Sequence, residues 1–284
     1  MKNLIVPLDF SKESLNGLEL AMLFTKKRST KIQMVYVQKK SSDYNSPGYF
    51  EEEKTYAEKK FKEIVAMYKS RLENNSELGY IIKAGRIYRE VVSQVESYQQ
   101  AMVVTSTHGG SGFEEFFIGS NAYKIISATN RPVLTIRKTS CPEDIRKIVM
   151  PIDITVDTRQ KVPFTVELAS LFGAEIHVIT ISSSKGKKLL NRLAAYGRQV
   201  EKYIKAKNVP YRSKSLFGDN IVDLIVVYAD SVDADLISVM KEQPKSLSFL
   251  GNFSQQILNR ATTPVLTISA KETHIATGFS TFGG

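Results

Sequence analysis

The feature that most constrains the fold of this chain is an internal repeat. The segment Pro-Val-Leu-Thr-Ile at residues 132–136 recurs letter for letter at residues 264–268. Near the start of each copy, Ile-Val-Pro-Leu-Asp at residues 5–9 is matched by Val-Met-Pro-Ile-Asp at residues 149–153. The two copies begin and end alike, and 284 residues suffice for two domains with separate cores. We therefore predict a first domain over residues 1–139, a second over residues 146–270 and a C-terminal tail over residues 271–284.

Each copy alternates short runs rich in β-branched residues with segments of helical periodicity. The strand-like runs lie at residues 4–8, 32–37, 79–82, 102–105 and 133–136 of the first copy, and at 149–152, 176–181, 211–214, 236–239 and 265–268 of the second. Helical patterns in the first copy begin after Ser11, a residue type that often caps helices, and cover residues 51–72, 86–98 and 121–129. This alternation predicts an open parallel α/β sheet in each copy, with helices on both faces and ligands beyond the carboxyl ends of the strands.

The charge of the chain is basic but evenly spread. The formal net charge is +10, with 21 basic against 15 acidic residues over residues 1–140 and 18 against 14 over the rest. Such an excess favours anionic partners such as nucleotides or nucleic acid. Because no basic helix stands out in the sequence, we interpret the charge as a solvated surface and expect neither specific nucleic-acid binding nor membrane association. A single cysteine, Cys141, and an N-terminus without a signal-peptide pattern indicate a cytoplasmic protein.

A glycine-rich segment follows the fourth strand-like run of the first copy. Residues 105–112 have the sequence Thr-Ser-Thr-His-Gly-Gly-Ser-Gly, and Gly119, Ser120 and Asn121 then open a helical segment. Glycines let backbone amides turn toward a phosphate, and the N-terminus of a helix favours an anion. The segment contains no lysine, so neutralising a phosphate would rest on amides, hydroxyls or a bound cation. The same pattern also fits an exposed turn before a capped helix, and alone it does not decide between the two.

The spacing of these residues resembles the universal stress protein family, whose ATP-binding members carry Gly-x2-Gly-x9-Gly-Ser/Thr at this position. In this chain Gly109, Gly119 and Ser120 match the pattern, and Ser106 stands where the family has its first glycine. The resemblance extends over nearly the whole chain as a tandem member, and it includes Val-Pro-Leu-Asp-Phe-Ser at residues 6–11 and the repeated Pro-Val-Leu-Thr-Ile segments. The side chain of Ser106 either narrows the phosphate pocket or adds a donor to it.

The resemblance implies a fold and a ligand. Each copy is expected to form a five-stranded sheet of order 3-2-1-4-5. The copies are expected to pack as a pseudo-dimer through their last strands. Whether chains associate further into homo-oligomers is left open. ATP, with or without Mg²⁺, would place its adenine and ribose near the ends of strands one and two and its phosphates on the glycine loop. Asp9 would accept a hydrogen bond from the adenine edge, and Val37 would pack against the base. The residues implied as ligand contacts are Pro7, Leu8, Asp9, Val37, Ser106, His108, Gly109, Gly119, Ser120 and Asn121.

Two of these assignments have alternatives, and the second copy departs from the pattern. Asp9 follows a strand and could cap the next helix, and His108 could be an exposed loop residue. The second copy keeps Asp153 after its first strand, but of the glycine motif it retains Gly251 alone, and Glu242 adds a negative charge unfavourable to phosphate. We therefore predict one nucleotide site, in the first copy, and interpret the second copy as a structural partner.

The sequence supports binding more strongly than catalysis. It contains no Gly-x4-Gly-Lys-Ser/Thr loop and no Gly-x-Ser-x-Gly elbow, the motifs of phosphate-loop NTPases and of α/β-hydrolases. The leading interpretation is an ATP-binding stress-response protein that acts through conformation and partners. Slow ATP hydrolysis is compatible with this interpretation but is not required by it. The alternatives are a structural or interaction protein of the same fold that binds no nucleotide, and a weak adenylate-handling enzyme.

The first copy also carries an extra polar segment, residues 39–50, after its second strand. Because this segment starts at the carboxyl edge of the sheet, we expect an irregular, adjustable cover over the nucleotide. Tyr49 or Phe50 would lie near the base or ribose, and Lys39 would approach the phosphates. The alternative is a variable surface loop without a role.

Overall fold

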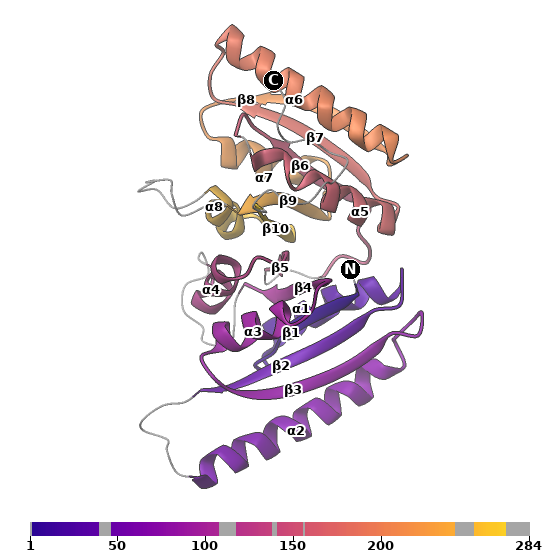
Figure 1. Cartoon of the computed structure of the whole chain (residues 1–284), viewed down its shortest axis with the longest axis vertical. Helices are drawn as coiled ribbons and strands as arrows, with labels where there is room; N and C mark the ends of the chain where they lie inside the picture. The colour runs from indigo at the N-terminus through magenta and orange to yellow at the C-terminus, as the bar shows by residue number, and fades with distance from the viewer. Residues whose placement is uncertain are drawn as a thin grey trace. The chain divides into compact units, whose positions relative to one another are not determined.

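The computed structural model describes residues 2–39, 47–107, 118–137, 141–155, 157–241 and 253–270. The chain forms two compact units, Met1–Cys141 and Pro142–Gly284. Each unit contains parallel strands with helices on both faces of the sheet (Figure 1). The α/β fold with tandem parallel sheets that the repeat predicted is therefore confirmed.

Five parallel strands form the sheet of the first unit in the order β3-β2-β1-β4-β5. They are β1 (Asn3–Pro7), β2 (Lys31–Lys39), β3 (Glu77–Gly85), β4 (Ala101–Ser106) and β5 (Val133–Ile136). The helices are α1 (Lys12–Thr25), α2 (Pro47–Lys69), α3 (Ile87–Glu96) and α4 (Ser120–Ala128). The chain leaves β1 toward β2 and later returns to β4 on the other side of β1. Such a reversal of strand order opens a crevice at the carboxyl ends of the strands.

The second unit repeats this arrangement in the order β8-β7-β6-β9-β10. Its strands are β6 (Lys147–Ile152), β7 (Glu175–Ser182), β8 (Tyr211–Phe217), β9 (Leu236–Lys241) and β10 (Val265–Ser269). Its helices are the short 3-10 turn η2 (Asp157–Arg159), α5 (Val162–Phe172), α6 (Lys187–Ala206), α7 (Ile221–Ser231) and α8 (Phe253–Arg260). Every strand expected from the sequence of either copy is present.

The buried core of the first unit centres on β1 and β4. The side chains of residues 4–6 and 102–104 are at most 1% exposed, because helices cover both faces of these central strands. A strand that is buried on both faces needs apolar residues at every position instead of alternate ones. This is why the strands appear in the sequence as continuous apolar runs.

The start of α2 differs from the prediction. The expected helix over residues 51–72 begins instead at Pro47 and ends at Lys69, so residues 47–50 of the expected irregular segment are helical. Pro-Gly suggested a turn, but proline is also favoured in the first turn of a helix, where its missing N–H has no partner to lose. Lys39 belongs to β2, and residues 40–46 lie outside the described part of the chain.

Helix α1 approaches β4 closely at Gly17. A Cβ atom at this position would lie 3.3 Å from Ser106 N and from Thr105 Cα. These are backbone atoms at the end of a central strand, so they cannot move aside as a flexible side chain would. Gly17 therefore sets the separation of α1 from the end of β4, where the glycine-rich segment begins.

We expect Gly17→Ala to destabilise the protein by about 1 kcal/mol, because overpacking of roughly 1–3 kcal/mol outweighs a gain of roughly 1 kcal/mol in helix propensity. Gly48→Ala is the matched control, since Gly48 also lies in a helix but a Cβ there meets no atom within 4 Å. The control should be as stable as the parent protein or more stable. Urea unfolding followed by circular dichroism gives both free energies, and equal effects would contradict the role of Gly17.

Candidate functional site

One cavity of about 790 Å³ lies at the carboxyl ends of β1, β2 and β4, at the point where the strand order reverses. Its size is within the usual range of small-molecule sites in proteins. Eight of the ten residues implied as ligand contacts line its wall, and they come from four separate elements or their ends: Pro7, Leu8, Asp9, Val37, Ser106, Gly119, Ser120 and Asn121. The other two, His108 and Gly109, lie outside the described residues.

Asp9 forms a local turn at the end of β1. Its Oδ1 atom accepts hydrogen bonds from the Ser11 backbone N–H at 3.0 Å and from the Ser11 hydroxyl at 2.5 Å. Ser11 in turn is the N-cap of α1, and its Oγ accepts a hydrogen bond from Ser14 N at 3.1 Å. The helix is therefore capped by Ser11, as predicted, and the alternative that Asp9 itself is the cap is wrong. Asp9 holds the capping residue and keeps an exposed carboxylate on the cavity wall.

The residue after Asp9 has an unusual backbone conformation. Phe10 has a φ of 66°, in the left-handed region that residues with a Cβ rarely adopt. Its ring stacks on Tyr36 with centroids 4.9 Å apart and meets the edges of Phe61 and Tyr56 at 5.0 and 6.1 Å. These aromatic contacts hold the strained residue in place. These contacts hold the backbone after Asp9, and the hydrogen bonds from Ser11 hold its carboxylate.

The opposite end of the cavity is formed by the end of β4 and the start of α4. Thr107 N donates to Ile136 O at 2.8 Å, and Gly119 N donates to Thr107 O at 2.6 Å. The second of these bonds holds Thr107, in the glycine-rich segment, next to Gly119, the residue that precedes α4. Gly119 is the N-cap of α4 and makes no side-chain cap hydrogen bond. The first N–H groups of α4 therefore lie beside cavity-lining Ser120 and Asn121, an arrangement that favours an anion.

Sequence reasoning missed a polar network on the α2 side of the cavity. The Tyr36 hydroxyl donates to Glu53 Oε1 at 2.7 Å. Gln38 Nε2 donates to Phe50 O at 2.9 Å and lies 3.4 Å from Glu53 Oε2. Burial, and then the hydrogen bond to the Glu53 carboxylate, raise the pKa of the Tyr36 phenol well above its usual value, so this hydroxyl stays a donor at all physiological pH values.

The helical start of α2 explains this network. Tyr49 and Glu53, four residues apart on one helix, both face the cavity. Lys39 lies on the same wall, at the end of β2. The expectation that Tyr49 and Lys39 come near the site agrees with these positions, but they belong to a helix and a strand and not to an irregular cover. The spacing of four residues between Tyr49 and Glu53 could have predicted that Glu53 faces the site. That prediction requires the helix to begin before residue 51, whereas the sequence pattern placed its start at residue 51.

The second unit repeats the Asp9 turn almost atom for atom. Asp153 Oδ1 accepts hydrogen bonds from Thr155 N at 2.8 Å and from Thr155 Oγ1 at 2.6 Å. Asp153 N contacts Thr158 Oγ1 at 3.2 Å, as Asp9 N contacts Ser14 Oγ at 3.4 Å. The aspartate after the first strand therefore has the same local structure in both units.

The two units differ one helical turn further on, where Lys161 takes the position of Gly17. Lys161 is 2% exposed, and its Nζ donates to Thr158 O at 2.5 Å and contacts Thr158 Oγ1 at 3.3 Å. Burial lowers the pKa of Lys161 to about 8, against the attraction of Asp153. The second unit thus places a buried amine beside Thr158, the counterpart of Ser14, which lines the cavity in the first unit. Residues 242–252, where the glycine motif is reduced, lie outside the described chain.

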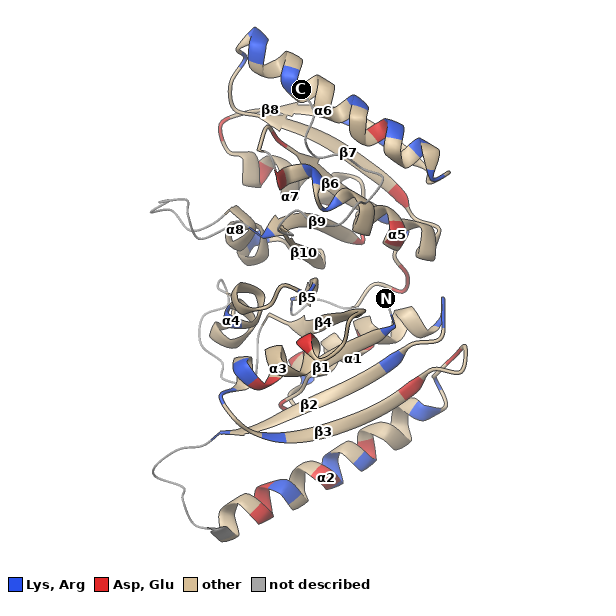
Figure 2. Ribbon diagram, viewed as in Figure 1, with Lys and Arg blue, Asp and Glu red and all other residues tan. Residues whose placement is uncertain are grey.

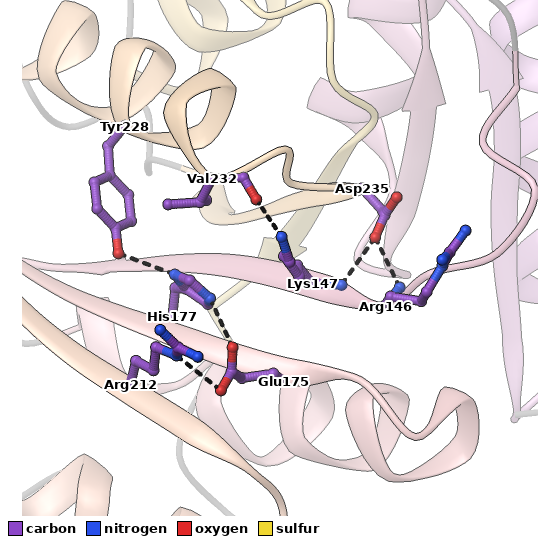
Figure 3. Close-up of polar contacts among 8 residues, drawn as sticks. All are labelled: Arg146, Lys147, Glu175, His177, Arg212, Tyr228, Val232 and Asp235. Atoms are coloured by element: carbon purple, nitrogen blue, oxygen red, sulfur yellow. Dashed lines mark hydrogen bonds and ion pairs between the residues drawn. The ribbon is translucent and has the colours of Figure 1, made fainter.

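A second polar cluster in the second unit lies at the amino end of β7 (Figure 3). His177 is buried, with Nδ1 2.9 Å from the Tyr228 hydroxyl and Nε2 3.0 Å from Glu175 Oε2. Arg212 Nε donates to Glu175 Oε1 at 3.1 Å. Although burial opposes ionisation, the hydrogen bonds from Arg212 and His177 keep the pKa of Glu175 below its usual value. This cluster joins α7 to β7 and β8 at the edge opposite to the carboxyl ends of the strands.

Comparison with known proteins assigns the chain to a family. The model of the universal stress protein family matches residues 1–137 and again residues 144–269. The chain therefore belongs to the universal stress protein family, as a member with two family domains in tandem. A search of curated proteins finds no similar sequence. No helix in the described parts of the chain has the length and apolar character needed to cross a membrane.

Solved structures show the same fold at low sequence identity. A universal stress protein from Archaeoglobus fulgidus DSM 4304 aligns over 95% of this chain and 97% of its own, with a TM-score of 0.78 and 18% identity. A putative universal stress protein from Pseudomonas aeruginosa UCBPP-PA14 aligns over 95% of this chain and 93% of its own, with a TM-score of 0.64 and 15% identity. The tandem arrangement of the fold is thus shared with proteins of very different sequence.

We expect Lys161→Met to stabilise the protein at neutral pH and to alter its pH dependence. With a folded-state pKa of about 8 against 10.5 when unfolded, the unfolded chain binds more protons between these values. The parent protein therefore gains stability as the pH rises through this window, and below it the fold is about 3 kcal/mol less stable with the charged amine than it would be with a neutral one. Chemical unfolding of both proteins should give a stability difference that shrinks between about pH 8 and pH 10.5. A difference that does not change with pH would contradict this account.

Proposed function

We propose that the first unit binds ATP in the cavity at the reversal of its sheet, and that the protein serves in a stress response through conformation and partner binding. The observation that carries this proposal is that Asp9, Val37 and Ser120, far apart in the sequence, line one cavity. The matching spacing of Gly109, Gly119 and Ser120 supports the same ligand. Family membership supports the class of protein.

The lining of the cavity divides into two ends of different chemistry. Leu8 and Val37 offer apolar surface at the ends of β1 and β2, and the Asp9 carboxylate beside them can accept a hydrogen bond from an amino group. The hydroxyls of Thr105, Ser106 and Thr107 and the N-terminus of α4 lie at the other end. An adenine suits the first end, and a chain of phosphates suits the second.

Charge balance favours a cation with the phosphates. Lys39, at the end of β2, is the basic residue of the described lining. Neutralising a triphosphate at the far end would therefore rest on amides, on hydroxyls and on Mg²⁺ bound together with the phosphates. Mg²⁺ commonly binds in this way, through phosphate oxygens and water with few protein ligands.

The side chains of the cavity favour binding over turnover. Its described carboxylates are Asp9 and Glu53. Asp9 already accepts two hydrogen bonds from Ser11, and Glu53 accepts hydrogen bonds from Tyr36 and Gln38. A general base for hydrolysis must lie beside the attacking water at the terminal phosphate, whereas Asp9 lies at the adenine end of the proposed orientation and Glu53 lies on the α2 side of the cavity. We therefore propose that nucleotide occupancy is the signal and that hydrolysis, where it occurs, is slow.

Substitutions at Ser120 test the phosphate end of the site. Ser120→Asp puts a carboxylate at the first residue of α4, where it stabilises the helix but repels phosphates. We expect the affinity for ATP to fall at least tenfold, or by about 1.4 kcal/mol, with thermal stability kept or raised. Ser120→Ala is the control, because it removes the hydroxyl without adding charge, and its effect should be several times smaller.

Adenosine separates a local effect on phosphate from a general loss of the site. Isothermal titration calorimetry should show that Ser120→Asp binds adenosine as the parent protein does. The proposed orientation would be wrong if adenosine and ATP were weakened equally. The proposal itself would be wrong if the parent protein bound neither ligand.

The number of sites tests the assignment to the first unit. Because Lys161 is buried beside the second aspartate turn and the second copy lacks the full glycine motif, calorimetry should give one ATP per chain. Val37→Trp, which fills the base end of the cavity, should abolish this single site. Two equivalent sites in the parent chain would contradict the assignment.

A further inference from the structure

The apolar face of helix α6 is buried in the core of the second unit. Leu193, Tyr196, Val200 and Ile204 are all at most 7% exposed, and the helix packs against β6, β7 and β8. These four residues recur at intervals of three or four, so they mark one side of the helix. Any partner of α6 must therefore bind the opposite side, which faces solvent.

That solvent-facing side is strongly basic, so the expectation from the sequence that no basic helix stands out is wrong for α6. Helix α6 contains six basic residues and one acidic residue, all of the basic ones exposed: Lys187, Lys188, Arg192, Arg198, Lys202 and Lys205. At 100° per residue, these six centre on the side opposite to the buried residues, with Arg192 at the edge of the face, where it donates to the Tyr196 hydroxyl at 2.9 Å. The single acid, Glu201, accepts a hydrogen bond from Ser213 Oγ of β8 at 2.6 Å and so turns toward the sheet. Among the described residues, no carboxylate forms a salt bridge with the six.

The needs of folding do not explain this charge. Lys187 and Lys188 occupy the first turn of α6, where the helix dipole disfavours positive charge. Lys188 and Arg192 are four residues apart, as are Arg198 and Lys202, and like charges at this spacing repel each other. Lys205 in the last turn is favoured by the dipole, but the charges in the first turn and the like-charged pairs oppose formation of the helix, and a bound polyanion would relieve both of these effects.

The duplicated helix of the first unit provides an internal comparison. Helix α2 occupies the same place, between the second and third strands of its unit, but contains five lysines and five glutamates. Some of these charges pair along the helix, as in Lys60–Glu63 at 3.1 Å and Lys54–Glu51 at 3.9 Å. Figure 2 shows both signs of charge along α2, whereas blue predominates on α6. The fold therefore does not require a basic helix between the second and third strands, because α2 has no net charge. The excess positive charge of α6 is particular to the second unit.

We propose that the outer face of α6 binds the phosphate backbone of nucleic acid without sequence preference. The basic residues from Lys187 to Lys205 extend over about 27 Å at 1.5 Å per residue, which makes a linear array of cations. A linear array suits a linear polyanion, whose charges are closely and evenly spaced. On α6, which is described throughout, Leu190 is the exposed large apolar side chain. One such residue does not supply the apolar face by which helices bind lipid surfaces.

Fluorescence anisotropy of the full chain with a labelled DNA duplex of about 16 base pairs tests this proposal over a range of salt. The parent protein should bind at about 50 mM NaCl, and the logarithm of its association constant should fall with the logarithm of salt with a slope of roughly −4. The triple variant Arg198→Gln, Lys202→Gln, Lys205→Gln should bind at least tenfold more weakly, with a slope smaller by about 3. Duplexes of different sequence should bind alike.

The matched control removes the same charge from the first unit. Lys59, Lys62 and Lys69 of α2 are exposed, and Lys59→Gln, Lys62→Gln, Lys69→Gln changes the net charge equally. This triple variant should lose less than about threefold in affinity. Circular dichroism and thermal melting should show that both triple variants are folded.

Three outcomes would overturn the proposal. Equal losses in the two triple variants would mean that net charge, and not the face of α6, attracts DNA. Failure of the parent protein to bind at about 50 mM salt would exclude a nucleic-acid surface. Binding to vesicles with about 30% phosphatidylserine, without binding to the duplex, would assign the face to a membrane surface instead.

Discussion

The backbone contact between α1 and β4 at Gly17 is the interaction on which the cavity of the first unit depends. One end of α1 is fixed by the Asp9–Ser11 turn at the carboxyl end of β1. Less than two helical turns later, Gly17 packs directly against the backbone of Thr105 and Ser106. A single helix therefore connects the two ends of the cavity, because the same element positions the aspartate turn and supports the start of the glycine-rich segment. The separation of the base end from the phosphate end is set by packing in the core and not by the loops alone.

The second unit keeps the local backbone structure of the first unit but places a different side chain in its interior. Its aspartate turn repeats the hydrogen bonds of the first unit, so the local structure after the first strand survived the divergence of the copies. At the position of Gly17, however, Lys161 carries an amine into the interior, where it is held by Thr158. Burying an amine is unfavourable unless hydrogen bonds compensate it, and here burial lowers its pKa to about 8. The two interiors therefore differ in polarity at this position, although the strands of the two units follow the same order.

The two units also differ in the charge of the helix between their second and third strands. The helix between the second and third strands packs one face on the sheet, and its other face is free to change without loss of the core. In the first unit this helix is balanced in charge, and its start contributes Tyr49 and Glu53 to the cavity. In the second unit the equivalent helix carries six exposed cations, of which Arg192 also donates to the Tyr196 hydroxyl. The net charge of +10 thus says less about the protein than where individual charges lie.

The sequence by itself determined the repeat, the alternation of strands and helices, the Ser11 cap and the set of residues that the family motif points to. These are local patterns, set by the covalent order of apolar, polar and glycine residues within a few turns of chain. Tertiary structure decided which distant residues meet: Tyr36 with Glu53, Gly17 with the end of β4, and Lys161 with the interior of the second unit. It also decided that the charges of α6 form one exposed face, because only the packing of Leu193 and Val200 against the sheet fixes the rotation of the helix. Local sequence fixes which elements form, whereas burial of apolar surface between elements fixes which side chains face a cavity, the core or water.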